Sequence, residues 1–224
     1  MNFVSTRRQA PAVTLSQAIA AGLAPDGGLY VYGRQPAPRE LRPGATLAAT
    51  AADLLRPFFA GDGLESELDA ICQTAFDVPA PLVPQATPDD YVLELFHGPT
   101  AAFKDFGARF LAQCLTRLPH AASRLLTIVV ATSGDTGAAV AAAFHRQPGQ
   151  RVVVLYPDER VSPRQAHQLG CFGENVVALR VAGTFDDCQA LVKRALNDEA
   201  LQARVPLSSA NSISLGRLLP QMGY

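Results

Sequence analysis

The sequence is poor in charge and in cysteine, and it has no long apolar run. Charged side chains make up 17% of its 224 residues, with a formal net charge of −1. Lysine and arginine are scattered, so the chain has no basic excess that would attract nucleic acid. No apolar run approaches the roughly 20 residues of a membrane span, and the first nine residues lack a secretion signal's apolar core. We therefore expect a cytoplasmic protein with no nucleic-acid or membrane partner.

The four cysteines are Cys72, Cys114, Cys171 and Cys188. None has the spacing of a metal site, and none lies in a C-x-x-C motif. Reduced cytoplasmic thiols, mostly packed inside as small apolar groups, are favoured over a metal or redox site.

Proline is concentrated between residues 79 and 88, and hydrophobic residues make up 48% of the chain, enough to bury a core. Proline lacks a backbone donor and disfavours helix in the residue before it. We therefore predict a linker here and a domain boundary near residue 85, with one domain over residues 1–85 and another over 86–224.

The first unit is predicted to be mostly helical. Thr14 and Gln17 have the spacing of a capping box for a short helix that ends at Gly22. Two amphipathic helices are expected over residues 47–59 and 64–76.

The second unit alternates strands with helices. Strands are predicted over residues 91–96, 125–131, 151–156 and 176–181, and helices over residues 103–118, 136–145, 163–169, 184–196 and 213–222. Strands that are apolar on both faces indicate a parallel sheet covered by helices, so the fold class is α/β.

Lys104 is a candidate nucleophile at a predicted helix start, between Phe103 and Phe106. A helix N-terminus disfavours a positive charge and so favours the neutral amine, the form that attacks a carbonyl. The alternative is that Lys104 pairs with Asp105 or Glu94 and extends into solvent.

The turn at residues 131–137 follows an apolar strand and opens an alanine-rich helix. Free amides at such a helix start, with the hydroxyls of Ser133 and Thr136, form an anion site where α/β sheets bind ligands. Alternatively, Ser133 or Asp135 is only a helix cap. The pattern is neither G-x-G-x-x-G nor a Walker loop, which argues against a dinucleotide or nucleoside triphosphate.

A third polar segment covers residues 208–217. It has several hydroxyls, the amide of Asn211 and the guanidinium of Arg217, which are donors suited to a phosphate. A cluster of helix caps followed by a surface arginine is an equally good interpretation.

Together these segments resemble the threonine synthase family. The similar segments are residues 5–7 and 22–31 (the N-terminal signature of bacterial and fungal members), 94–107 (the pyridoxal phosphate lysine motif, with Lys104 at the lysine), 132–137 (the loop facing substrate and cofactor) and 211–217 (the substrate-phosphate segment). The resemblance implies the fold-type II, tryptophan synthase β-like fold.

The resemblance also implies a reaction, in which O-phospho-L-homoserine and water give L-threonine and phosphate. It implies that Lys104 forms a Schiff base with pyridoxal phosphate, with Phe103 and Asp135 also in the cofactor site and a monomer or homodimer as the assembly. The implied substrate contacts are Ser133, Gly134 and Thr136 for the carboxylate, and Asn211, Ser212 and Arg217 for the phosphate.

Two departures from the family pattern affect these expectations. Ser214 stands where the family usually has asparagine. The family also continues for about as long again, including the loop for the cofactor phosphate, so this chain is expected to be an N-terminal portion that is inactive alone. A serine or threonine dehydratase and a non-catalytic remnant that binds an anion or a protein are the rival hypotheses.

Overall fold

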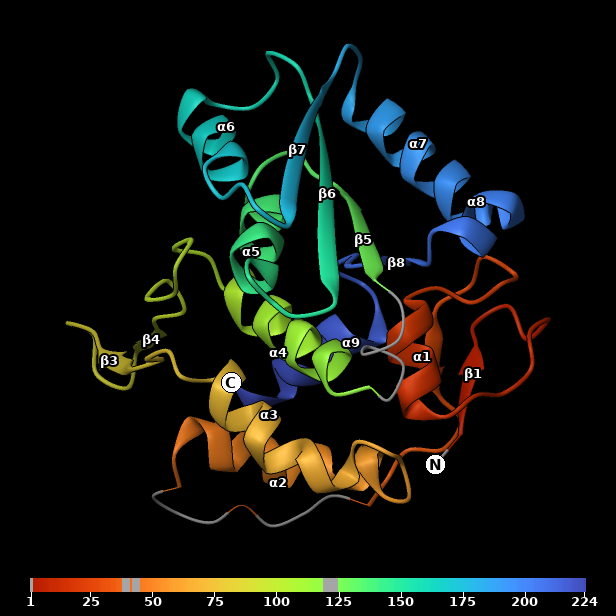
Figure 1. The fold of residues 1–224 in the computed structure, drawn as a ribbon. Helices are drawn as coiled ribbons and strands as arrows, with labels where there is room; N and C mark the ends of the chain where they lie inside the picture. Colours follow the sequence, from red (N-terminus) through yellow and green to blue (C-terminus); the bar gives the residue numbers. More distant parts are fainter. Residues whose placement is uncertain (1, 38–40, 42–44, 119–124) are drawn as a thin grey trace.

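The structure, a computed structural model, describes residues 2–37, 41, 45–118 and 125–224 (Figure 1). Up to residue 85 its elements are β1 (Phe3–Ser5), α1 (Leu15–Ala21), β2 (Tyr30–Tyr32), α2 (Leu47–Phe59), the 3₁₀ turn η1 (Glu65–Glu67), α3 (Leu68–Ala75) and β3 (Leu82–Pro84). They are followed by β4 (Tyr91–Leu93), α4 (Lys104–Thr116), β5 (Leu126–Ala131), α5 (Asp135–Phe144), β6 (Gln150–Pro157), α6 (Pro163–Gly170), β7 (Val176–Val181), α7 (Phe185–Asn197), α8 (Glu199–Arg204), β8 (Leu207–Ser209), α9 (Leu215–Leu218) and η2 (Leu219–Gly223). In the described part of the chain, no helix is long and apolar enough to cross a membrane.

The predicted fold class is confirmed. The unit before residue 85 is mostly helical, and β7, β6, β5 and β8 form a parallel sheet in that order. Helices α5 and α6 cover one face of the sheet and α7 covers the other (Figure 1). The carboxyl ends of β5 and β8 therefore open toward α5, α7 and the segment after β8.

Local capping signals fix several helix starts. The Thr14 hydroxyl accepts from the Gln17 amide, and the Gln17 side chain accepts from the Thr14 amide, so the predicted capping box of α1 is present. A capping box of Thr184 and Asp187 likewise begins α7, the helix predicted over residues 184–196. Helix α1 ends at Gly22, whose φ of 72° suits glycine, and a Cβ there would come within 2.9 Å of the Ser209 carbonyl oxygen.

Within the predicted linker, residues 82–84 form the short strand β3, which was not predicted. β3 pairs antiparallel with β4, and Pro84 lies opposite Tyr91 at the end of the hairpin. Proline is tolerated there because an edge strand can leave one donor position unused. The hairpin lies apart from the four-stranded sheet (Figure 1), so the strand predicted at residues 91–96 ends early and is not part of that sheet.

Two short elements near the end of the chain also differ from prediction. β8 was not predicted because it has only three residues, two of them serines. The Ser208 hydroxyl can be buried because it donates a hydrogen bond to the Ala20 carbonyl at 2.6 Å. The helix predicted over residues 213–222 stops as an α-helix at Leu218 and continues as η2. Pro220 explains the change, because proline cannot donate and its ring clashes with the preceding turn.

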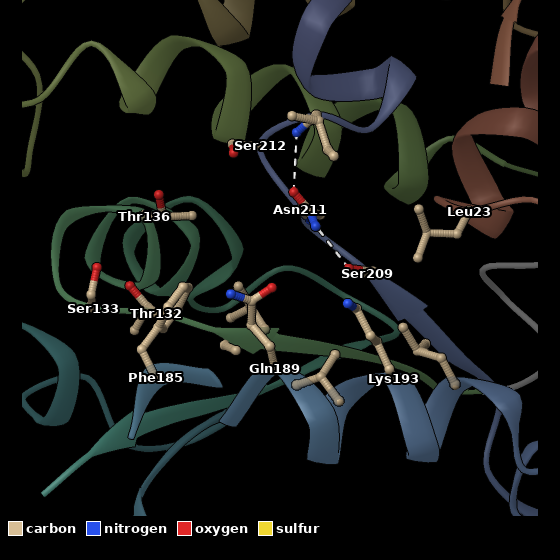
Figure 2. A pocket seen from close by; sticks show the side chains of 15 residues that line it. Leu23, Thr132, Ser133, Thr136, Phe185, Gln189, Lys193, Ser209, Asn211 and Ser212 are labelled. Carbon is tan, nitrogen blue, oxygen red and sulfur yellow. Dashed lines mark hydrogen bonds between the residues drawn. The ribbon is translucent and has the colours of Figure 1, made fainter. Parts of the chain in front are cut away.

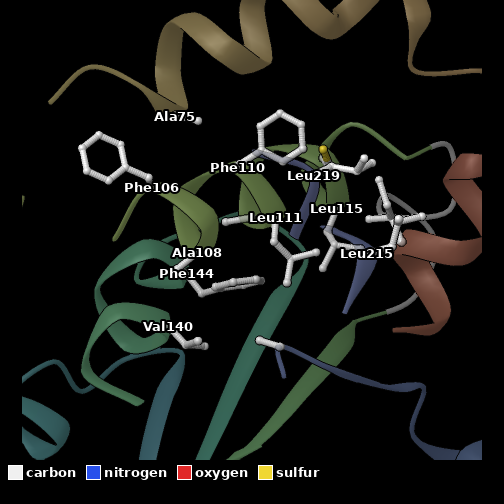
Figure 3. Packing of buried hydrophobic residues seen from close by; sticks show 14 of the residues in the cluster. Ala75, Phe106, Ala108, Phe110, Leu111, Leu115, Val140, Phe144, Leu215 and Leu219 are labelled. Atoms are coloured by element: carbon white, nitrogen blue, oxygen red, sulfur yellow. The ribbon is translucent and has the colours of Figure 1, made fainter. Parts of the chain in front are cut away.

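Helix α4 lies at the centre of the core and has two apolar faces. Phe106 and Phe110 face α3, whereas Ala108 and Leu111 face Phe144 of α5 (Figure 3). One cluster of buried side chains runs from Phe3 to Leu219. Helix α4 therefore joins the N-terminal helices to the sheet layer, and Lys104 is its first residue.

Candidate active site

The loop before α4 is tied to the helix by Asp105. This carboxylate is 1% exposed and accepts from the Thr100 amide at 2.9 Å and the Thr100 hydroxyl at 2.6 Å. Its place in the first turn is favourable, because a helix N-terminus attracts negative charge. A Cβ at Gly98 would collide with the same carboxylate, which explains the glycine. The backbone around Lys104 is thus held in one conformation.

The Lys104 side chain points to the second predicted segment. Its Nζ lies 3.5 Å from Oδ2 of Asp135 and 4.7 Å from the centroid of the Phe103 ring. Lys104 does not pair with Asp105 or Glu94, the alternative partners. Asp105 accepts a hydrogen bond from the Thr100 hydroxyl, and a Glu94 carboxylate oxygen lies 2.7 Å from His97 Nε2. The side chain is 24% exposed, so the amine is partly enclosed rather than extended into solvent.

Thr132 organises the turn between β5 and α5. It is 2% exposed, and its Oγ1 accepts from the amides of Gly134 (3.0 Å) and Gly137 (2.9 Å) and donates to the Gly134 carbonyl (3.0 Å). This role of Thr132 was not predicted. The signal was available, since a threonine at a strand end followed by two glycines is a pattern of hydroxyl-bonded turns.

The helix-cap alternative for Ser133 and Asp135 is wrong. The N-cap of α5 is Gly134, with φ 149° and ψ −100° and no side-chain cap. A Cβ at Gly134 would collide with the Gln165 amide, which donates to Asp135 at 3.2 Å. By helix geometry the amides of Asp135 and Thr136 have no acceptor within α5, so they can meet an anion.

We expect Thr132→Val to destabilise the turn. Valine keeps the shape but leaves the buried amides of Gly134 and Gly137 without their acceptor, so the free energy of unfolding should fall by about 1–3 kcal/mol. Urea unfolding measures the change. Thr132→Ser is the matched control because it keeps the hydroxyl, and equal losses in the two variants would contradict the assigned role.

The third segment divides into two parts. Asn211 and Ser212 follow β8 and line a cavity, and the Asn211 side chain accepts from the Ile213 amide at 3.2 Å. Ser214 is buried, and its hydroxyl has no hydrogen-bond partner in the described residues. The hydroxyl of the serine that replaces the family's asparagine therefore makes no hydrogen bond to the described residues.

Arg217 is placed differently from the prediction. It is 3% exposed, and its guanidinium donates to the carbonyls of Ala210 (3.1 Å) and Lys104 (3.4 Å). Burial lowers the pKa of Arg217 to about 10, against the smaller opposing effects of Tyr224 and Asp105. Arg217 does not line the cavity, so the geometry does not support the predicted phosphate contact and instead shows a support beneath the Lys104 backbone.

The cavity has a volume of about 310 Å³ and lies at the carboxyl ends of β5 and β8 (Figure 2). Its polar wall combines Thr132, Ser133 and Thr136 with Asn211 and Ser212. Helix α7 forms the opposite wall, which the sequence had not indicated as part of a site. The predicted segments at residues 131–137 and 208–217 thus both contribute residues to one cavity. Lys104 does not line this cavity, but its Nζ contacts Asp135 at the start of α5.

The chain matches two protein-family models and is similar to known threonine synthases. Residues 2–76 match the family model "Threonine synthase N terminus", and residues 79–212 match "Pyridoxal-phosphate dependent enzyme". The chain is 44% identical to threonine synthase of Escherichia coli K12 over 95% of its length and 50% of the relative's. It is 40% identical to that of Buchnera aphidicola subsp. Baizongia pistaciae, over 100% of its length and 53% of the relative's.

Solved structures of threonine synthases have a similar fold. The crystal structure of E. coli threonine synthase has a TM-score of 0.89 at 39% identity, and the chain covers 53% of it. A structure of threonine synthase from Brucella melitensis, described as bound to pyridoxal phosphate, has a TM-score of 0.88 at 39% identity, with 50% covered. All of this chain is covered in both cases, so it spans about half the length of these relatives. The fold is that of the fold-type II enzymes, and the chain belongs to the threonine synthase family of pyridoxal-phosphate-dependent enzymes, of which it matches an N-terminal portion.

Proposed function

We propose that Lys104 is the residue that bonds pyridoxal phosphate. We propose further that a polypeptide of the relatives' full length converts O-phospho-L-homoserine and water into L-threonine and phosphate, a lyase reaction. The observation that carries the proposal is the 3.5 Å contact between Lys104 Nζ and Asp135 at the starts of two helices. It brings an amine next to an anion-binding turn, although 31 positions separate the two residues.

The described residues fit the reactive end of the cofactor. An aldehyde needs an amine, and Lys104 Nζ is partly enclosed and held next to Asp135. The Phe103 ring beside Nζ provides an apolar surface for a planar ring. Asp135, held by Gln165, is the proposed partner of the cofactor's 3′-hydroxyl.

When bound, pyridoxal phosphate supplies an electron sink for carbanion chemistry. The chain's own residues supply placement and proton transfer. Freed from the cofactor, Lys104 Nζ carries protons among the α, β and γ carbons of the substrate. Ser133, Gly134 and Thr136, with the free amides of α5, bind the substrate carboxylate. Asn211 and Ser212 bind its phosphate, and Arg217 acts through the Lys104 backbone.

Sodium borohydride reduction in the presence of pyridoxal phosphate tests the cofactor assignment. The sequence contains two lysines, Lys104 and Lys193, so peptide mapping by mass spectrometry has few candidate sites. We expect the cofactor to be fixed on Lys104. A protein labelled only at Lys193 or at the terminal amine would contradict the assignment, and an unlabelled protein would favour the non-catalytic alternative.

Product analysis tests the reaction. A polypeptide of the relatives' length should release phosphate and threonine from O-phospho-L-homoserine, whereas deamination of threonine or serine without that activity would favour the dehydratase alternative. The 224-residue chain alone is expected to be inactive, since it spans half the length of its relatives. A cytoplasmic location remains part of the proposal.

A further inference from the structure

Two polar side chains of helix α7, Gln189 and Lys193, line the cavity and have no role in the proposed function. Gln189 and Lys193 are four residues apart, so they lie on the same face of the helix. Figure 2 shows both side chains rising from α7 into the cavity, with Asn211 and Ser212 on the far side and Thr136 at the turn.

The cavity is electropositive. Among the described residues that line it, Lys193 is the only charged one, and none is Asp or Glu. No described carboxylate lies within ion-pair distance of the Lys193 ammonium. The N-terminus of α5 adds its partial positive charge to the same space. An anion is therefore the ligand that this charge distribution favours.

The donors surround the cavity rather than lying on one side of it. Asn211 and Ser212 come from the segment after β8, and the Gln189 amide and Lys193 ammonium come from α7 on the opposite side, while Ser133 and Thr136, assigned to the carboxylate, lie at the start of α5. A phosphate presents several oxygens in different directions and accepts from such a set better than a planar carboxylate does. Apolar side chains, including Val130, Val192 and Leu196, complete the lining of the cavity.

Arg217, the cation within the segment at residues 208–217, already makes hydrogen bonds within the protein. Arg217 is buried and does not line the cavity, and its guanidinium donates to the Ala210 and Lys104 carbonyls. Lysine binds phosphate as a point charge and needs no planar partner. Lys193 is thus the side chain available to neutralise a ligand held by Asn211 and Ser212.

We infer that Lys193 and Gln189 of α7 form the cationic wall of a phosphate-monoester subsite whose other wall is Asn211 and Ser212. The inference rests on the proposed function for the identity of the ligand, a phosphorylated amino acid. It adds α7 as a helix that contributes to specificity, because a substrate without the phosphate would lack the contact with the Lys193 ammonium.

Isothermal titration of the 224-residue chain with inorganic phosphate, and separately with O-phospho-L-homoserine, tests the subsite without the cofactor. We expect both to bind, and Lys193→Met to weaken both by about tenfold, the effect of losing one charged hydrogen bond. Lys193→Arg should keep most of the affinity. Arg194→Met is the matched control, because Arg194 is an exposed cation next in sequence that does not line the cavity.

Absence of phosphate binding in the wild-type chain, or equal affinities of Lys193→Met and wild type, would overturn the inference. An equal loss in Arg194→Met would also overturn it, because a general charge effect would then explain the result. Borohydride labelling of Lys104 separates the two proposals. Lys193-dependent phosphate binding without labelling leaves the subsite standing while the cofactor assignment fails, and labelling without such binding gives the reverse.

Discussion

Lys104→Ala is expected to abolish borohydride-fixed cofactor in this chain. In a polypeptide of the relatives' length it should lower threonine formation by on the order of 10³-fold or more, because attachment and proton transfer are lost together. The structure makes the loss specific. Lys104 Nζ is the amine at Asp135, whereas the other lysine, Lys193, projects from α7 into the cavity (Figure 2).

The two lysines provide matched controls for each other. Lys193→Met should retain the label on Lys104, while Lys104→Ala should show none, as measured by intact mass after reduction. Lys104→Ala should keep its stability within about 1 kcal/mol, because partly exposed ion pairs contribute little. A label that persists in Lys104→Ala, or wild-type turnover by that variant, would rule out the assigned role.

Local chemistry made much of the fold predictable. Capping boxes at Thr14 and Thr184 and the apolar runs of β5, β6 and β7 depend on neighbours in sequence, and the structure has these elements within a few residues of the prediction. β8 was not predictable in this way. Its serines are satisfied by a partner 188 positions away, the Ala20 carbonyl, which no local pattern reveals.

The candidate site likewise has one part that a local pattern predicts and other parts that only the fold brings together. The turn at residues 132–137 was predicted from its own pattern, because it follows an apolar strand and opens a helix. Asn211 and Ser212 reach that turn only through β8, which was not predicted. The place of Arg217 was not predicted, because a charged residue is expected at the surface unless its donors are bonded to carbonyls that only the fold brings near. Lys193 was overlooked since a lysine on an amphipathic helix is ordinarily solvated, and only the cavity distinguishes it.

Phe110→Ala is expected to lower the free energy of unfolding by about 3–5 kcal/mol, the usual cost of removing a fully buried phenylalanine. Phe110 has no exposed surface, and its ring centroid lies 6.2 Å from that of Phe59 and 6.3 Å from that of Phe76. It therefore fills the junction between α4 and the helices of the first unit (Figure 3). Phe96→Ala is the matched control. Phe96 is 53% exposed, so its loss should change stability by about 0.5 kcal/mol or less.

The same variant tests whether the predicted division at residue 85 separates independent domains. One continuous core joins α2 and α3 to α4 and the sheet, so a cavity at Phe110 should loosen both sides together. Hydrogen exchange measured by mass spectrometry should then show peptides from α2 and from β6 losing protection to the same extent. If only the peptides before residue 85 lost protection, the first unit would be a separate cooperative domain. The Lys104–Asp135 pair would then be held by the second unit alone, because α4 and α5 both lie after the boundary.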